Sequence, residues 1–282
     1  MSNPRAFCFS YAFVYIRDRK KEGWMDMSKT AILVDGGFYR KRATHLWGKH
    51  TPEEAASALF SYCMRHLSER KHQHELYRIF YYDCPPIKKQ MYHPLLGKTI
   101  DLGKSEQYAW MTEFLNQLKM RRKVALRLGS LDNNNSAFYL KYDVQKKLCA
   151  GTIQVSELGV DDFEPNIKQK GVDMKIGVDI ASLSYKKQVD QIVLIAGDSD
   201  FVPAAKLARR EGIDFVLDPL GAEINAQLFE HIDGKRSCGN PYTSGKSSGN
   251  QKIKIRPGAA TPGRSEQKPH QYVNKGELST LL

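Results

Sequence analysis

The stretch QIVLIAGDSDFVPAAKLARREGIDFVLD, residues 191–218, reads as a strand, a helix and a second strand in succession. Residues 191–197 form a short apolar run, and residues 213–218 form another, which ends before Pro219. Between them, residues 202–210 carry apolar side chains at helical spacing. Units of this kind build parallel sheets whose two faces are covered by helices. The stretch therefore predicts an α/β protein.

The same alternation continues on the N-terminal side of this stretch. Strand patterns end in a Gly pair, in Cys-Pro-Pro or in a polar loop, and one helix opens with a Thr-Pro-Glu-Glu capping sequence. We predict strands at 31–35, 76–83 and 124–129, and helices at 51–67, 105–120 and 171–185. This pattern predicts a Rossmann-like α/β/α sandwich with a mostly parallel sheet. No role is assigned to the region from 84 to 167 as a whole. Within it, residues 136–167 show no readable pattern of helix or strand.

Charge and composition divide the 282-residue chain into three parts. Residues 1–27 are predicted to be an N-terminal extension, with a misassigned start as one explanation. Residues 28–234 are predicted to form the folded domain. Residues 235–282 are rich in Gly, Ser, Pro and Lys, which predicts a disordered basic tail. This tail supplies +7 of the net charge of +12, so we expect it to act as an electrostatic arm towards a polyanion such as nucleic acid.

The sequence favours a reducing, cytoplasmic location. The five cysteines lie far apart and form no Cys-x-x-Cys pair, so neither a disulfide framework nor a zinc knuckle is indicated. The apolar segment 6–16 is too short to span a bilayer and is followed by basic residues instead of a cleavage site. We therefore expect no membrane association, and a homo-oligomer is compatible with the sequence.

Four aspartates directly follow predicted strands: Asp35, Asp83, Asp198 and Asp218. The carboxyl ends of parallel strands share one edge of the sheet, where ligands bind in open α/β folds. Neighbouring carboxylates repel one another, and a divalent cation is the common remedy. Asp200 has two interpretations at this point, as a cap of the helix that follows it or as part of the chemistry.

Asp173 and Asp179 lie on one predicted helix but not on one face. Six residues of helix rotate by about 600°, which leaves the two side chains about 120° apart. Asp173 lies in the first turn, where it either complements the helix dipole or joins the acids at the sheet edge. Asp179 lies among apolar residues, so we expect it to have a different role.

Three segments, AILVDGGF (31–38), KGVDMKIGVDIASL (170–183) and VLIAGDSDFVPAAKLARREGIDFVL (193–217), resemble in this order the NYN domain of the PIN-like nucleases, the LabA-like branch especially. The resemblance covers most of 28–234. It implies a PIN-like fold, an acidic pocket that binds Mg²⁺ or Mn²⁺, and hydrolysis of RNA phosphodiester bonds. By position, it implies that the metal-binding and catalytic acids are Asp35, Asp173, Asp198 and Asp200. It also matches Asp179 to a position that is commonly acidic.

Carboxylates suit this chemistry, because a bound Mg²⁺ activates water and stabilises the leaving oxyanion while needing few protein ligands. We therefore expect the carboxyl groups of Asp35, Asp173 and Asp198 to converge within about one coordination shell, with Asp200 at its margin. One departure is the sequence DGGFYRK (35–41), since many family members carry an Asn shortly after the first Asp.

Other motifs favour structural roles. The histidines at 66, 72 and 74 do not have the spacing of a standard zinc site. The aromatic residues at 77 and 80–82 are typical of the core of a strand. The basic residues at 88, 89, 98 and 121–123 form either an RNA-facing surface or solvated charge.

Two alternative functions remain open. One is a catalytically weak RNA-binding or adaptor protein that retains the NYN fold. The other is a different α/β enzyme, against which no D-x-D element lies in the first strand and no Gly-rich phosphate loop follows a strand.

Overall fold

The computed structural model describes residues 27–68, 74–131 and 136–243. Its centre is a six-stranded sheet in which every neighbouring pair of strands is parallel. The strand order is β12-β11-β10-β1-β2-β5. The strands of this sheet are β1 (Ser28–Asp35), β2 (His74–Asp83), β5 (Val124–Leu128), β10 (Gln191–Ile195), β11 (Asp214–Asp218) and β12 (Gly234–Lys235). The predicted α/β fold with a parallel sheet is confirmed.

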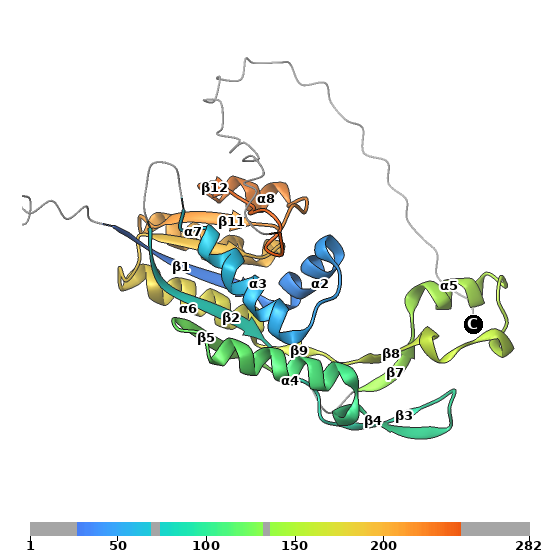
Figure 1. Ribbon diagram of the computed structural model, residues 1–282. Helices are drawn as coiled ribbons and strands as arrows, with labels where there is room; N and C mark the ends of the chain where they lie inside the picture. The colour runs from blue at the N-terminus through green and yellow to red at the C-terminus, as the bar shows by residue number, and fades with distance from the viewer. Residues whose placement is uncertain (1–26, 69–73, 132–135, 244–282) are drawn as a thin grey trace, which may run out of the picture.

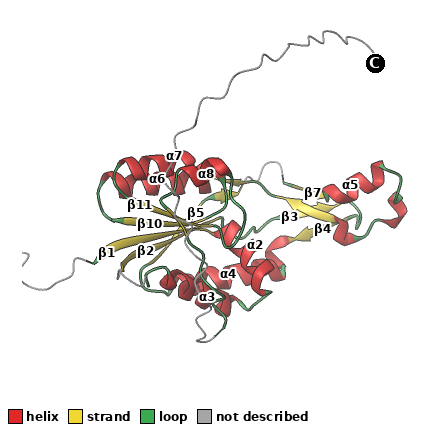
Figure 2. Cartoon of the chain, turned by 90° about the horizontal axis from the view of Figure 1, so that it is seen from above, coloured by secondary structure: helices red, strands yellow, loops and turns green. Residues whose placement is uncertain are grey.

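Helices cover both faces of this sheet (Figure 2). On one face lie α2 (Gly36–Trp47), α3 (Pro52–Arg65) and α4 (Glu106–Lys119), and on the other lie α6 (Val172–Tyr185), α7 (Val202–Arg210) and α8 (Ala226–Glu230). Each face has its own buried apolar cluster, because alternate side chains of a strand point to opposite faces. The strands β1 and β10 are buried on both faces, which explains their unbroken apolar runs.

The order of the strands determines where a ligand site is expected. The chain moves outward from β1 through β2 to β5, and then returns to the other side of β1 to form β10, β11 and β12. The direction of winding therefore reverses between β1 and β10. In doubly wound sheets the loops diverge at this switch point and leave a crevice at the carboxyl ends of the strands. Asp35 ends β1, and Asp198 follows β10.

Most of the region to which the sequence assigned no role forms an arm, which consists of the described residues 84–105, 129–131 and 136–171. It contains three antiparallel strand pairs, β3 (Gln90–His93) with β4 (Lys98–Asp101), β6 (Ser130–Leu131) with β9 (Gln169–Lys170), and β7 (Ala137–Leu140) with β8 (Phe163–Asn166), and the helix α5 (Tyr142–Cys149). The arm projects away from the central sheet (Figure 1). The two segments of the arm follow the carboxyl ends of β2 and β5. The arm therefore begins at the edge of the sheet where the strand-end acids lie.

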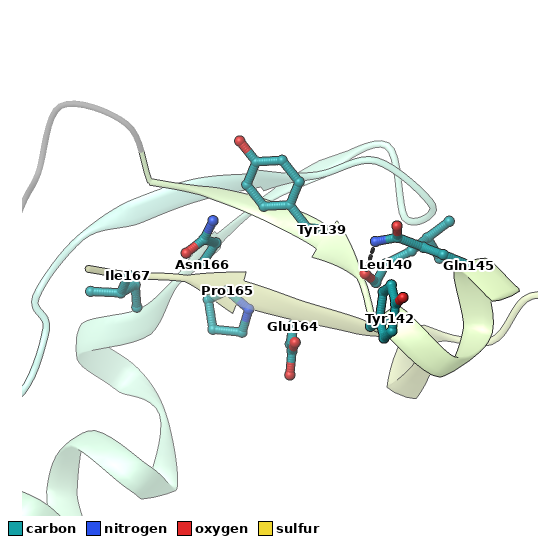
Figure 3. A pocket seen from close by; sticks show the side chains of 8 residues that line it. All are labelled: Tyr139, Leu140, Tyr142, Gln145, Glu164, Pro165, Asn166 and Ile167. Atoms are coloured by element: carbon teal, nitrogen blue, oxygen red, sulfur yellow. Dashed lines mark hydrogen bonds between the residues drawn. The ribbon is translucent and has the colours of Figure 1, made fainter. Parts of the chain in front are cut away.

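The arm has a small core of its own. His93 is 1% exposed, and its ring centroid lies 4.7 Å from that of Phe138 and 5.0 Å from that of Phe163. These contacts hold the β3–β4 hairpin against the β7–β8 pair. The arm carries an open depression of about 440 Å³, lined by residues 139, 140, 142, 145 and 164–167. Figure 3 shows the side chains that line it. None of the four predicted site acids lines it.

The first residues of the segment predicted to be a C-terminal tail make specific contacts with the folded domain. Residues 235–243 are ordered and pack against α3, beginning with Lys235 in β12. Arg236 donates hydrogen bonds to the carbonyl oxygens of Arg65, His66 and Ser68 at the C-terminal end of α3. The ring of Tyr242 stacks on His50 with centroids 3.6 Å apart. A composition rich in Gly, Ser and Lys did not reveal these specific contacts.

The predicted N-terminal extension lies outside the described residues apart from Met27, and so do residues 244–282 of the predicted tail. Within the described ranges, no helix is both long and apolar enough to cross a membrane.

Candidate active site

Asp35 ends β1 and begins α2. Its Oδ1 accepts a hydrogen bond of 3.0 Å from the backbone N–H of Phe38, so the carboxylate caps the helix. Gly36 is required at the next position, because a Cβ there would lie 2.5 Å from the ring of Tyr81 and 2.6 Å from the carboxylate of Asp83. Burial raises the pKa of Asp35 from 3.8 to about 6, and the negative charges of Asp173 and Asp83 contribute in the same direction.

Asp198 is held in the turn after β10. Its Oδ1 accepts a 3.0 Å hydrogen bond from the backbone N–H of Asp200. The helix α7 has no side-chain cap, so the interpretation of Asp200 as its cap is wrong. Both acids are exposed. A Cβ on Gly197 would lie 2.5 Å from the ring of Phe38, so this glycine lets the turn after β10 pack on the start of α2. This packing fixes the turn of Asp198 relative to that of Asp35.

Asp173 lies in the first turn of α6, after Gly171 in the left-handed region (φ = 80°). The residue is exposed, but neighbouring atoms shield its carboxyl group in part, and this shielding raises its pKa. The charges of Asp198 and Asp200 raise the pKa further. The pKa of Asp35 responds to the charge of Asp173 in the same way. Asp173 therefore interacts electrostatically with acids on both sides of the switch point.

These interactions do not amount to a closed metal cage. Among the described residues, no group of three or more His, Cys, Asp or Glu side chains is placed to hold a metal ion. The expectation that Asp35, Asp173 and Asp198 converge within one coordination shell is therefore not met. The donors at the switch point are carboxylate oxygens, which suit Mg²⁺ or Mn²⁺. Because Mg²⁺ retains several waters and binds through one or two carboxylates, this open arrangement fits such an ion.

Asp83, which ends β2, has a different environment. Its side chain is 1% exposed and forms a two-pronged ion pair with Arg40 of α2, with a shortest distance of 2.8 Å from Nη2 to Oδ2. The hydroxyl of Tyr81 donates to the same carboxylate at 2.8 Å. The sequence analysis missed Arg40. A helix that starts at Asp35 places residue 40 in its second turn, but only the structure shows which acid it meets.

Asp218, which ends β11, is also buried and paired. Its carboxylate accepts hydrogen bonds from Tyr62 Oη at 2.6 Å, from His66 Nε2 at 2.9 Å and from Ser237 Oγ at 2.6 Å. The outer two strand-end acids are therefore neutralised within the fold. In contrast, none of Asp35, Asp173, Asp198 and Asp200 forms an ion pair with a basic side chain of the described chain.

Asp179 is a structural residue. Its Oδ2 accepts hydrogen bonds from Tyr82 Oη at 2.8 Å and from Arg127 Nε at 2.9 Å, which ties α6 to β2 and β5. The contacts of Asp179 therefore differ from those of Asp173, because Asp179 forms an ion pair with Arg127.

The other motifs also have structural contacts. His74 meets Thr30 Oγ1 at 3.0 Å, and His72 lies outside the described residues. Residues 80–82 are buried strand core, as predicted. Arg121 bonds to Ser57, and Lys123 pairs with Glu75 at 3.2 Å. These two basic side chains lie near the start of β5, at the opposite edge of the sheet from the acids, so they do not form one surface with them.

Comparison with protein families matches part of this chain to a known domain. The NYN domain family matches residues 112–225, which include Asp173, Asp198 and Asp200. This part of the chain is therefore similar to the NYN domain, and the match spans less than half of the chain. The match does not distinguish the LabA-like branch from other NYN domains.

Individual proteins add little to this assignment. An uncharacterised protein of Methanocaldococcus jannaschii is 34% identical over 61 residues, which are 22% of this chain and 25% of that protein. A structure of a protein of unknown function from Vibrio parahaemolyticus RIMD 2210633 aligns over 74% of this chain and 91% of that chain, with 13% identity and a TM-score of 0.37. That score is too low to show a shared fold, so the α/β/α description depends on the strand order and layers given above.

Proposed function

We propose that this protein is a divalent-metal-dependent ribonuclease of the LabA-like NYN type, which hydrolyses RNA phosphodiester bonds at the switch point between β1 and β10. The supporting observation is the contrast among the acids at the sheet edge. Asp83 and Asp218 have cationic partners, whereas Asp35, Asp173, Asp198 and Asp200 form no ion pair with a basic side chain of the described chain. The charge of Asp173 helps to raise the pKa of Asp35, and the charges of Asp198 and Asp200 help to raise that of Asp173. Uncompensated carboxylates at a ligand-binding edge indicate a site for a cation.

The roles of the four acids follow from their positions. Asp35 and Asp198 would hold Mg²⁺ or Mn²⁺ from the two sides of the crevice, with Asp173 beside them and Asp200 at the exposed margin. The bound ion supplies an activated water and compensates the charge of the leaving oxygen. Asp35 must lose its proton to act as a ligand, and its pKa of about 6 means that it does so just below neutral pH. The Phe38 ring and Gly197 keep the two turns in contact.

A second candidate function is an RNA-binding adaptor that retains the fold without efficient cleavage. The observation in its favour is that no three of the described acids are placed to hold one ion. In this case any bound metal would stabilise the fold without catalysing hydrolysis.

An RNA cleavage assay separates the two candidates. The full chain is incubated with single-stranded RNA and with structured RNA, in Mg²⁺, in Mn²⁺ or in EDTA. We expect shorter products with either metal and none with EDTA. RNA binding without cleavage in all conditions would favour the adaptor. Cleavage that persists in EDTA would contradict a metal-dependent site.

A further inference from the structure

A second cluster of titratable side chains, which the proposed function does not use, surrounds Asp218. His66 and Asp218 are both 0% exposed in their side chains and lie 2.9 Å apart, from Nε2 to Oδ2. Tyr62, Ser237 and the backbone N–H of Leu220 donate the other hydrogen bonds to the carboxylate. With four donors around it, Asp218 holds the position of the imidazole ring.

His66 is a buried cation with one unused donor. Burial by itself would lower its pKa, but the hydrogen bond to Asp218 and the neighbouring Cys238 raise it to about 9. At neutral pH both ring nitrogens therefore carry a proton. Nε2 donates to Asp218, whereas Nδ1 is buried and has no hydrogen-bond partner within normal limits. A buried N–H without an acceptor costs free energy, so a nearby anion would be favoured.

Cys238 lies beside this cluster, because it follows Ser237, whose hydroxyl donates to Asp218. It is close enough to His66 to act on the charge of the ring. Its backbone N–H donates to Tyr62 Oη at 3.0 Å, which fixes the residue beside the cluster. Cys238 is partly exposed, so a small reagent can reach it. A second thiol, Cys63, is fully buried in the apolar cluster against which Cys238 packs, and the two interact electrostatically.

We propose that Cys238 is a reactive thiol that hydroperoxides oxidise, and that Cys63 then forms a disulfide with it. A cysteine beside an imidazolium that a carboxylate holds in place has the arrangement of an activated cysteine nucleophile.

The reaction balances in two steps. The sulfur of Cys238 attacks one oxygen of the hydroperoxide, the O–O bond breaks, and a sulfenic acid and water (or an alcohol) are formed. The thiol of Cys63 then attacks the sulfenic sulfur, an S–S bond forms, and the hydroxyl leaves as water. In total, two thiols lose two electrons to one hydroperoxide. The product joins α3 to the segment that follows β12.

Cys149 provides a matched control within the same chain. It is the most exposed of the described cysteines and lies at the end of α5. Among the described residues, no histidine or carboxylate forms a hydrogen bond with its thiol. Exposure alone predicts that Cys149 reacts before Cys238. The His66–Asp218 pair predicts the reverse order.

The test is site-resolved oxidation of the reduced full chain by limiting hydrogen peroxide, followed by alkylation and peptide mass spectrometry. We expect Cys238 to be oxidised at least tenfold faster than Cys149 and to be recovered linked to Cys63. In the Cys63→Ala variant we expect a sulfenic acid at Cys238 that a dione probe traps. Equal or faster oxidation of Cys149 would overturn the proposal, and so would a fast Cys238 that never links to Cys63.

A second variant tests the role of the imidazolium. His66→Gln retains an N–H donor towards Asp218 but removes the positive charge beside Cys238. We expect the oxidation rate of Cys238 to fall to that of Cys149 in this variant. An unchanged rate in a folded variant would contradict activation by His66. If the variant does not fold, the comparison of Cys238 with Cys149 in the parent protein still decides.

Discussion

The acids at the carboxyl edge of the sheet fall into an outer pair and an inner group. The outer pair, Asp83 and Asp218, end β2 and β11, are buried, and are matched by Arg40 and His66. The inner group is Asp35, Asp173, Asp198 and Asp200, around the junction of β1 and β10, and it has no matching cation in the described chain. By residue type alone, all six acids were equivalent candidates for a metal site. The presence or absence of a cationic side chain beside each one distinguishes the two sets. A strand-end acid is therefore a functional candidate only when the fold leaves its charge uncompensated.

The difference has energetic consequences of opposite sign. A buried carboxylate with a cationic partner stabilises the fold as long as both charges are present, and losing one leaves the other uncompensated. A carboxylate near others of the same charge destabilises the metal-free fold once it ionises. Substitution by Asn should therefore cost stability at an outer position and recover it at an inner one.

The largest expected effect on stability is at Asp83. Asp83→Asn leaves Arg40 partly buried without its counter-charge, so we expect the free energy of unfolding to fall by roughly 3 kcal/mol. Denaturant unfolding with parallel detection by fluorescence and circular dichroism measures this change. Asp198→Asn is the matched inner control and should unfold at or above the parent midpoint. Equal losses in both variants would remove the distinction between outer and inner acids.

A smaller effect of opposite sign is expected at Asp35. Its pKa of about 6 in the fold lies above its ordinary value of 3.8, so the folded state retains this proton to a higher pH than the unfolded chain does. Stability of the metal-free protein should therefore fall as the pH rises from 3.8 to about 6. Asp35→Asn retains an oxygen that can cap α2 and removes the charge. We expect a gain on the order of 1–2 kcal/mol at pH 7.

Thermal unfolding in EDTA and in saturating Mg²⁺, from pH 4 to pH 8, checks this prediction. The advantage of Asp35→Asn should disappear with Mg²⁺, because the cation compensates the parent carboxylate. A pH profile that is identical in parent and variant would show that Asp35 has an ordinary pKa.

The smallest expected effect concerns the C-terminal residues. Residues 244–282 contain seven basic and two acidic side chains, and a chain ending at 243 retains the contacts with α3. We expect its removal to weaken RNA affinity by about tenfold or less and to reduce the salt slope, since fewer counterions are released. Filter binding at several salt concentrations measures both quantities. A lower melting temperature of the truncated chain, or an unchanged salt slope, would contradict the role as an electrostatic arm.

The fold was largely predictable wherever local patterns and tertiary packing agree. The helix α7 was predicted with its observed bounds, because a strand precedes it and Gly212 ends it. The helix α2 was missed, since Gly36 and Gly37 read as the end of a strand while Asp35 caps a helix there. The strand pairs of the arm were missed because strands of two to four residues, exposed on most sides, carry no periodic signal.

The candidate site was predictable only in part. Asp35 and Asp198 were placed at one edge because β1 and β10 are parallel, and this placement needs only the alternation of strands and helices. The sequence could not tell Asp83 from Asp35, since the partner of Asp83 is Arg40 on a helix that was not predicted. It could not find the cluster around Asp218 either, because His66 is distant in sequence from Asp218, Ser237 and Cys238 and meets them only after folding.

The most direct test of the account is the rate of RNA cleavage by Asp198→Asn in saturating Mg²⁺, measured beside Asp179→Asn. Both substitutions remove one negative charge, but Asp179 pairs with Arg127 outside the inner group. We predict that Asp198→Asn folds normally and cleaves at least about a hundredfold more slowly than the parent, whereas Asp179→Asn stays within about tenfold of it. Mg²⁺-dependent cleavage at the parental rate by pure Asp198→Asn would contradict the assignment of the inner acids as the active site.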